Sequence, residues 1–181
     1  MSQKALILSF ISVFLCTPFF VLAADMTMET GSRAGKIEIS VYADTVQKEP
    51  FNAAEASILF DDNIFEVSHI DTSDSIFNLW TMPPKITAEG NIVFSGGTSG
   101  KGGFIFKGKL FSFVLEPKED GKTTFSFEDP KVLAHDGTGT NILSDAKGLT
   151  LVNTHAIPKE YDTDGNGTVS LYELSVGMAE K

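Results

Sequence analysis

The chain has 181 residues, of which 42% are hydrophobic, and a formal net charge of −10 at pH 7. This length suits one domain of ordinary size with a short appendage, and a second full domain would not fit. The negative charge argues against nucleic acid or an anionic membrane as the partner, because both are bound through clustered cations. Divalent cations are compatible with this charge.

Residues 1–23 are typical of a secretory signal peptide. Lys4 supplies a positive start, an apolar run begins at Ala5, and the segment ends on the small residue Ala23. We expect cleavage after Ala23 or Ala24, a secreted or extracytoplasmic location, and a mature chain of charge −11 with no membrane span. The alternative is an uncleaved membrane anchor, for which the apolar stretch is just long enough.

The single cysteine, Cys16, lies inside this predicted signal. Lipidation there is disfavoured, because Leu15 occupies the position where a lipoprotein signal needs a small residue. The mature chain would then contain no cysteine. Disulfide bonds, thiol catalysis and cysteine-ligated zinc are therefore excluded from the expected functions.

Residues 24–153 predict an antiparallel all-β domain, because short segments alternate apolar with polar side chains and so bury one face. These segments are Ile37–Val41, Ala56–Phe60, Ile92–Phe94, Phe125–Phe127 and Leu149–Leu151. Residues that favour turns separate them. These turn signals are Asp61–Asn63, Pro83–Pro84, Gly96–Gly97, Gly102–Gly103, Asp120–Gly121, Asp129–Pro130 and Asp136–Gly137.

Two features of this domain lead to more specific expectations. The stretch Phe104–Leu115 is too long and apolar for an edge strand, and Gly108 in its middle predicts a bulge or a change of direction. A core-filling role is expected for nearly all of the fifteen phenylalanines. The single tryptophan, Trp80, is expected to close one end of that core, with contact to a ligand as the alternative.

Residues 154–160 read as a linker that contains Pro158, and residues 161–181 read as a calcium-binding loop followed by a short helix. The segment Asp162–Glu173 satisfies the EF-hand loop pattern, which surrounds calcium with six to eight oxygens. Gly167 permits the sharp turn that this loop requires. The expected ligands are the side chains of Asp162, Asp164, Asn166 and Glu173, the backbone carbonyl of Thr168, and Ser170 through water.

The helix after the loop is predicted from four apolar residues: Val169, Leu171, Leu174 and Met178. No amphipathic helix precedes the loop, so we expect weaker binding than at a paired sensor site. The alternative interpretation is a solvated turn that binds nothing tightly.

No pattern in the sequence supports catalysis. His69, His135 and His155 lack the spacing of zinc ligands, and no serine lies in a nucleophile elbow. The many carboxylates could include a glycosidase pair, but nothing selects which two. We therefore predict a protein that is not an enzyme.

An ordered set of segments then indicates a family. The segments are Gly35–Val41, Asn52–Asp61, Phe65–Val67, Ser75–Trp80, Gly90–Gly97, Gly108–Phe113, Gly121 and Asp136–Ile142. Together they resemble a bacterial cohesin domain, the scaffold module that binds dockerins in cellulosomes and related assemblies. The resemblance implies a nine-stranded jelly-roll β-sandwich, related in fold to carbohydrate-binding modules, and a non-catalytic role in protein–protein association.

The calcium loop resembles one half of a dockerin, which normally carries two such repeats. It departs from that pattern because it is single and ends in Glu173 where a dockerin usually has Asp. The leading hypothesis is an exported module that binds a protein partner through one sheet face, with a dockerin-like protein as a candidate. Two alternatives are a polysaccharide-binding module, which shares the sandwich fold, and a calcium-dependent surface or adhesion component.

Overall fold

The computed structural model describes residues 24–45 and 49–154 of the chain. These residues form ten β-strands and no helix, so they contain no helix that could cross a membrane. The predicted signal peptide, most of the linker and the predicted calcium loop lie outside the described residues.

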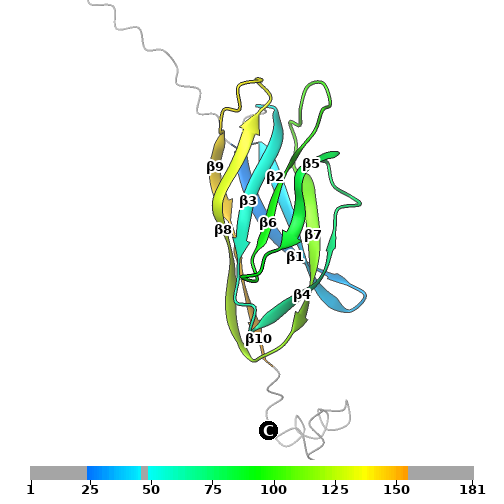
Figure 1. Cartoon of the computed structure of the whole chain (residues 1–181), viewed down its shortest axis with the longest axis vertical. Helices are drawn as coiled ribbons and strands as arrows, with labels where there is room; N and C mark the ends of the chain where they lie inside the picture. Colours follow the sequence, from blue (N-terminus) through cyan, green and yellow to red (C-terminus); the bar gives the residue numbers. More distant parts are fainter. Residues whose placement is uncertain (1–23, 46–48, 155–181) are drawn as a thin grey trace, which may run out of the picture.

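The ten strands form two five-stranded sheets that face each other (Figure 1). The first sheet has the order β4-β7-β2-β1-β9 and the second has the order β10-β8-β3-β6-β5. Neighbouring strands pair antiparallel except β1 and β9, which are parallel. The strands are β1 (Ala24–Arg33), β2 (Lys36–Thr45), β3 (Phe51–Leu59), β4 (Phe65–Asp71), β5 (Leu79–Ile86), β6 (Ile92–Gly97), β7 (Gly108–Pro117), β8 (Gly121–Ala134), β9 (Leu143–Lys147) and β10 (Leu149–Asn153).

The core lies between the two sheets and is rich in phenylalanine. Five phenylalanines have no more than a trace of exposed surface: Phe51, Phe65, Phe111, Phe113 and Phe125. Phe111 of β7 meets Phe94 of β6 across the core, with ring centroids 4.9 Å apart. Trp80 is half-buried against the core and lies edge to face with Phe77 at 5.8 Å. The predicted core role of these aromatic residues is therefore confirmed.

The predicted all-β sandwich is also confirmed, with ten strands in place of nine. At Gly148 the chain passes from β9 in the first sheet to β10 in the second. A Cβ atom at Gly148 would lie 1.9 Å from the backbone oxygen of Phe125. The glycine therefore allows the chain to cross between sheets in direct contact with β8.

Several predicted turns lie inside strands. Pro83–Pro84 belong to β5, where they are tolerated because β5 is an edge strand and its outer N–H groups have no sheet partner. Asp129–Pro130 belong to β8, where Asp129 has a φ of 48° and the register with β3 shifts. This shift is a β-bulge, which uses the same residue types as a turn.

The expectation for Phe104–Leu115 is confirmed in part, because β7 is an interior strand and its register with β2 shifts between Lys109 and Phe111, close to Gly108. Residues 98–107 form a loop, and the strand begins at Gly108 and runs through the middle of the first sheet. A Cβ atom at Gly108 would lie 2.4 Å from Cδ1 of Ile76, so this glycine marks a close packing contact. The apolar residues that follow it are buried because β7 is flanked by β4 and β2.

Candidate functional site

The outer face of the first sheet is covered by ion pairs. Arg33 on β1 contacts Asp71 at 2.5 Å and Glu38 at 3.6 Å, and Glu38 also accepts a hydrogen bond of 2.8 Å from Ser112. Hydrogen bonds from Ser73 and from Arg33 hold the pKa of Asp71 well below its usual range. This part of the face consists of polar groups that satisfy one another.

Further pairs extend this covering over the rest of the same face. They are Lys36 with Glu116 at 2.6 Å, Lys109 with Asp74 at 3.3 Å, and Lys107 with Glu29. The ammonium of Lys107 also lies 4.6 Å from the ring centroid of Tyr42, which it covers. The first sheet therefore offers a partner mainly charges that are already paired.

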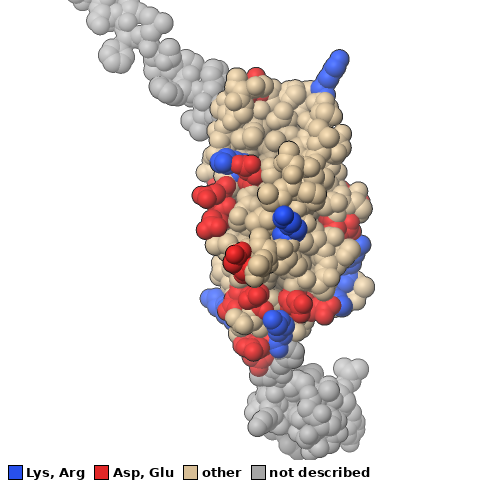
Figure 2. Space-filling model, in the orientation of Figure 1, with Lys and Arg blue, Asp and Glu red and all other residues tan. Residues whose placement is uncertain are grey.

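The outer face of the second sheet is built differently, because its two middle strands present short side chains. In β3, Ala54, Ala56 and Ile58 point into the core, so Ser57 points outward. In β6, Ile92 and Phe94 point inward, so Val93 points outward and lies opposite Ser57. Figure 2 views this face, on which charged side chains gather along one edge and in the lower half while the upper half is nearly uncharged.

Longer side chains from the flanking strands lie on both sides of the short side chains of β3 and β6. Met82 and Lys85 stand on β5, and Asp129 and Lys131 stand on β8. Together with Ser57 and Val93 they enclose a groove with a volume of about 420 Å³. We refer to it below as the β3/β6 groove.

A polar row crosses one end of the groove. Lys131 donates a 2.6 Å hydrogen bond to Glu55, and this contact raises the pKa of Lys131. Ser95 donates to the second carboxylate oxygen of Glu55 at 3.4 Å and accepts a 2.9 Å bond from Thr81. The row joins β8, β3, β6 and β5, so it fixes the positions of the groove walls relative to the floor.

The β5 wall of the groove carries an exposed apolar side chain. Met82 lines the groove and is 39% exposed, and Leu79, opposite Gly97 at the start of the same strand, is 53% exposed. Ile86 is 45% exposed, but it lies opposite the inward-facing Ile92 and lines a different hollow. Large apolar side chains exposed beside a groove are typical of an interaction site. The pair Pro83–Pro84 in the same strand supplies no N–H groups, so this edge is poorly suited to adding a further strand.

The sequence reasoning did not identify the groove residues. The one local signal was in the segment around Trp80, where apolar residues flank a Pro–Pro pair. Since a Pro–Pro pair is confined to an edge strand, its apolar neighbours cannot all be covered by the sheet. The rest of the groove depends on the pairing of β3 with β6 and β8.

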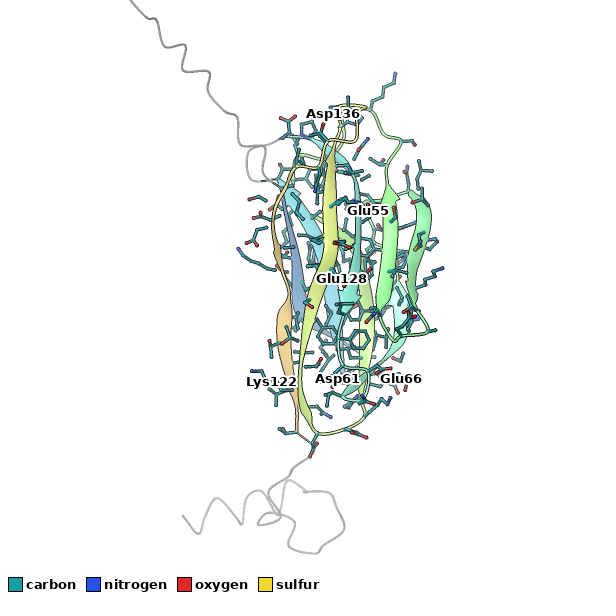
Figure 3. All side chains as sticks on the ribbon, turned by 60° about the vertical axis from the view of Figure 1, so that its left-hand side comes forward. Glu55, Asp61, Glu66, Lys122, Glu128 and Asp136 are labelled. Carbon is teal, nitrogen blue, oxygen red and sulfur yellow. The ribbon has the colours of Figure 1, made fainter. Side chains whose placement is uncertain are left out.

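No catalytic or metal-binding cluster is found in the described residues. They contain no group of three or more His, Asp or Glu side chains placed to hold a metal ion. Figure 3 shows Glu55 and Glu128 in the middle of the second sheet, Asp136 at one end, and Asp61 and Glu66 at the other. Carboxylates distributed in this way do not converge on one cleft.

The six predicted calcium ligands, from Asp162 to Glu173, lie outside the described residues, so the calcium site remains a prediction. Of the histidines within the described ranges, His69 and His135 are both exposed.

A stacking platform for sugars would need exposed aromatic rings. Across residues 24–45 and 49–154, Phe106 is the one aromatic residue among the exposed large hydrophobics, so these residues present no row of rings.

Comparison with known proteins gives a consistent result for the fold. No family model and no curated protein sequence matches the chain. Solved structures do match it. The cohesin of a type I cohesin–dockerin complex from Clostridium thermocellum aligns with a TM-score of 0.57 at 15% identity, over 71% of this chain and 91% of that chain.

Two further matches come from other organisms. The seventh ScaB type I cohesin of Pseudobacteroides cellulosolvens has a TM-score of 0.58 at 11% identity, over 71% of this chain and 90% of that chain. A non-cellulosomal cohesin from the archaeon Archaeoglobus fulgidus has a TM-score of 0.50 at 14% identity, over 77% of this chain and 98% of that chain. The described sandwich therefore has the fold of cohesin modules.

Proposed function

We propose that this protein is an exported, non-catalytic binding module that holds a protein partner on the outer face of its second sheet. The observation that carries the proposal is the contrast between the two faces. One is covered by ion pairs, and the other has a groove with a low floor and an apolar wall on β5. Protein interfaces combine apolar and polar contacts, and this groove offers both.

The solved structures with the same fold support a protein partner over a small molecule. The Clostridium thermocellum cohesin was solved in a complex with a dockerin. A dockerin-like protein is therefore the partner class that we propose. Export rests on the predicted signal peptide of residues 1–23, and the absence of catalysis rests on the dispersed carboxylates among the described residues.

We also propose that Asp162–Glu173 binds one calcium ion. The support is the sequence pattern, since hard oxygen donors occur at each position where an EF-hand loop requires one. The ion would fix the start of the helix that the sequence predicts after the loop.

The test of the binding face uses two matched serine substitutions in the full chain. Ser57→Arg places a long cationic side chain on the floor of the groove, and Ser40→Arg places the same side chain on β2 in the opposite face. Both serines are half-buried and lie on strands in the interior of their sheets. The two variants should therefore have similar melting temperatures.

The partner is first captured from secreted proteins on immobilised wild type, and its affinity is then measured for each variant by calorimetry. Ser57→Arg should weaken binding at least 100-fold, about 2.7 kcal/mol, and Ser40→Arg should leave it within a few-fold of wild type. Equal binding by wild type and Ser57→Arg, or a larger loss in Ser40→Arg, would contradict the proposal.

A further inference from the structure

The chain leaves the sandwich at one end and heads away from the groove. Asn153, at the end of β10, pairs with Gly121 at the start of β8, and its side chain donates a 2.8 Å hydrogen bond to the carbonyl of Glu119. β10 runs antiparallel to β8 and lies at the lower end in Figure 1. The groove residues Asp129 and Lys131 lie further along β8, roughly 26 and 33 Å from Gly121 at about 3.3 Å per residue.

The linker is too short to return easily to this groove. The eight residues between Asn153 and Asp162 span at most about 29 Å when fully extended. To place the predicted helix over its own groove, the linker would have to reverse direction and remain almost fully stretched. A tether that barely spans two sites gives a low effective concentration, so the groove of another molecule is the easier target.

The dimensions of the groove suit the helix that the sequence predicts after the calcium loop. Leu171, Leu174 and Met178 follow the spacing of one helix face, and at about 1.5 Å per residue they extend over roughly 10 Å. Two strand spacings of about 4.8 Å separate β3 from β5, which also gives roughly 10 Å. Exposed Met82 lines the groove on the β5 side, and Leu79 is exposed on the same strand.

The charges of the two elements are compatible. The segment 161–181 contains four acidic residues and one lysine. Lys85, on the β5 wall of the groove, has no ion-pair partner among the described residues. Lys85 can therefore pair with an acidic residue of a helix that enters the groove.

We propose that the β3/β6 groove of one molecule binds residues 161–181 of a second copy, so that the chain associates head to tail when calcium is present. The inference rests on the proposed function, because it names the occupant of the same groove. Such a contact joins two different surfaces, so it produces rings or open chains of molecules. Calcium controls it by fixing the loop that precedes the helix.

The experiment uses sedimentation velocity on the full chain, in calcium or in EDTA, over a range of concentrations. Wild type and Ser40→Arg should form species larger than a monomer in calcium and should be monomeric in EDTA. Ser57→Arg blocks the groove but keeps the C-terminal segment, and Glu173→Ala removes a predicted calcium ligand but keeps the groove. Each of these two variants alone should remain monomeric, with at least a 100-fold weaker self-association than wild type.

An equimolar mixture of the two variants provides the decisive result. One variant contributes an intact C-terminal segment and the other an intact groove, so the mixture should form calcium-dependent heterodimers and nothing larger. Wild type that stays monomeric at every concentration would overturn the inference, as would equal self-association of wild type and Glu173→Ala. Monomeric wild type that sediments faster in calcium than both variants would mean that each groove binds its own C-terminal segment, which also overturns it.

The same variants separate this inference from the proposed function. If wild type is monomeric but Ser57→Arg abolishes binding of a captured protein, the groove is a binding site with another occupant. If Ser57→Arg changes neither self-association nor partner binding, the groove has no role and both proposals fail.

Discussion

The substitution Phe111→Ala tests the packing that supports the groove. Phe111 is completely buried on β7, and its ring lies 4.9 Å from that of Phe94, an inward-facing residue of β6 directly beneath the groove. Replacing a buried phenylalanine by alanine costs about 3–5 kcal/mol, because apolar contacts are lost and a cavity remains. A typical domain is stable by about 5–15 kcal/mol, so the variant should fold but with much of its stability lost.

For a domain of this size each kcal/mol corresponds to about 3–4 °C, so Phe111→Ala should lower the melting temperature by roughly 10–20 °C. The matched control is Phe106→Ala, the same chemical change at a loop residue that is 54% exposed. Its ring centroid lies 5.8 Å from that of Phe104. The control should cost about 1 kcal/mol or less. Both are measured by calorimetric melting of the full chain, and equal shifts in the two variants would refute the assigned core.

Three more predictions concern the sheet crossing, acid stability and calcium. Gly148→Ala should destabilise the fold by about 1–3 kcal/mol in urea unfolding, because its Cβ would lie 1.9 Å from the backbone oxygen of Phe125; an unchanged midpoint would contradict this contact. The folded pKa of Asp71 is lowered by Ser73 and Arg33, so its stabilisation is complete above about pH 4 and is lost as the pH falls toward the folded pKa. Asp71→Asn should therefore show a shallower loss of melting temperature between about pH 4 and 2, and parallel profiles would refute this linkage. Glu173→Ala should abolish calcium uptake in calorimetry, and equal heats in variant and wild type would rule out the predicted ligand.

The fold was predictable because its main determinant is local. In β2 the apolar residues Ile39, Val41 and Ala43 occur at every second position, and each of them is fully buried. A strand with one apolar face must cover that face, and many such strands in one chain require two sheets packed together. The segment alone therefore predicts both the strand and the side on which the core lies.

The details of the turns were less predictable, because a turn signal does not state which partner lies beside it. Asp129–Pro130 would be suitable for a turn at the end of a strand, but here they form a bulge that lets β8 continue alongside β3. Pro83–Pro84 would interrupt a central strand, but β5 has no neighbour on its outer side. Both outcomes depend on strand order, which residues distant in sequence decide.

The groove was unpredictable for the same reason. Ser57, Val93 and Lys85 lie on three different strands, and they become neighbours only through the register of β3 with β6 and of β6 with β5. A serine or a valine that points outward on an isolated strand indicates nothing about binding. The register of the strands places these residues side by side, as the floor and wall of one groove.

The two outer faces differ in the chemistry of the surface that they expose to water. On the first sheet, Arg33 and Asp71 are charged groups that water solvates well, so their pairing adds little stability but leaves no apolar surface uncovered. On the second sheet, Leu79 and Met82 expose apolar surface that folding of the described residues does not cover. Covering such surface is favourable by about 25 cal/mol for each Å², and that free energy is available only to a partner. The exposed apolar side chains of β5 therefore favour the second sheet as the binding face that we propose.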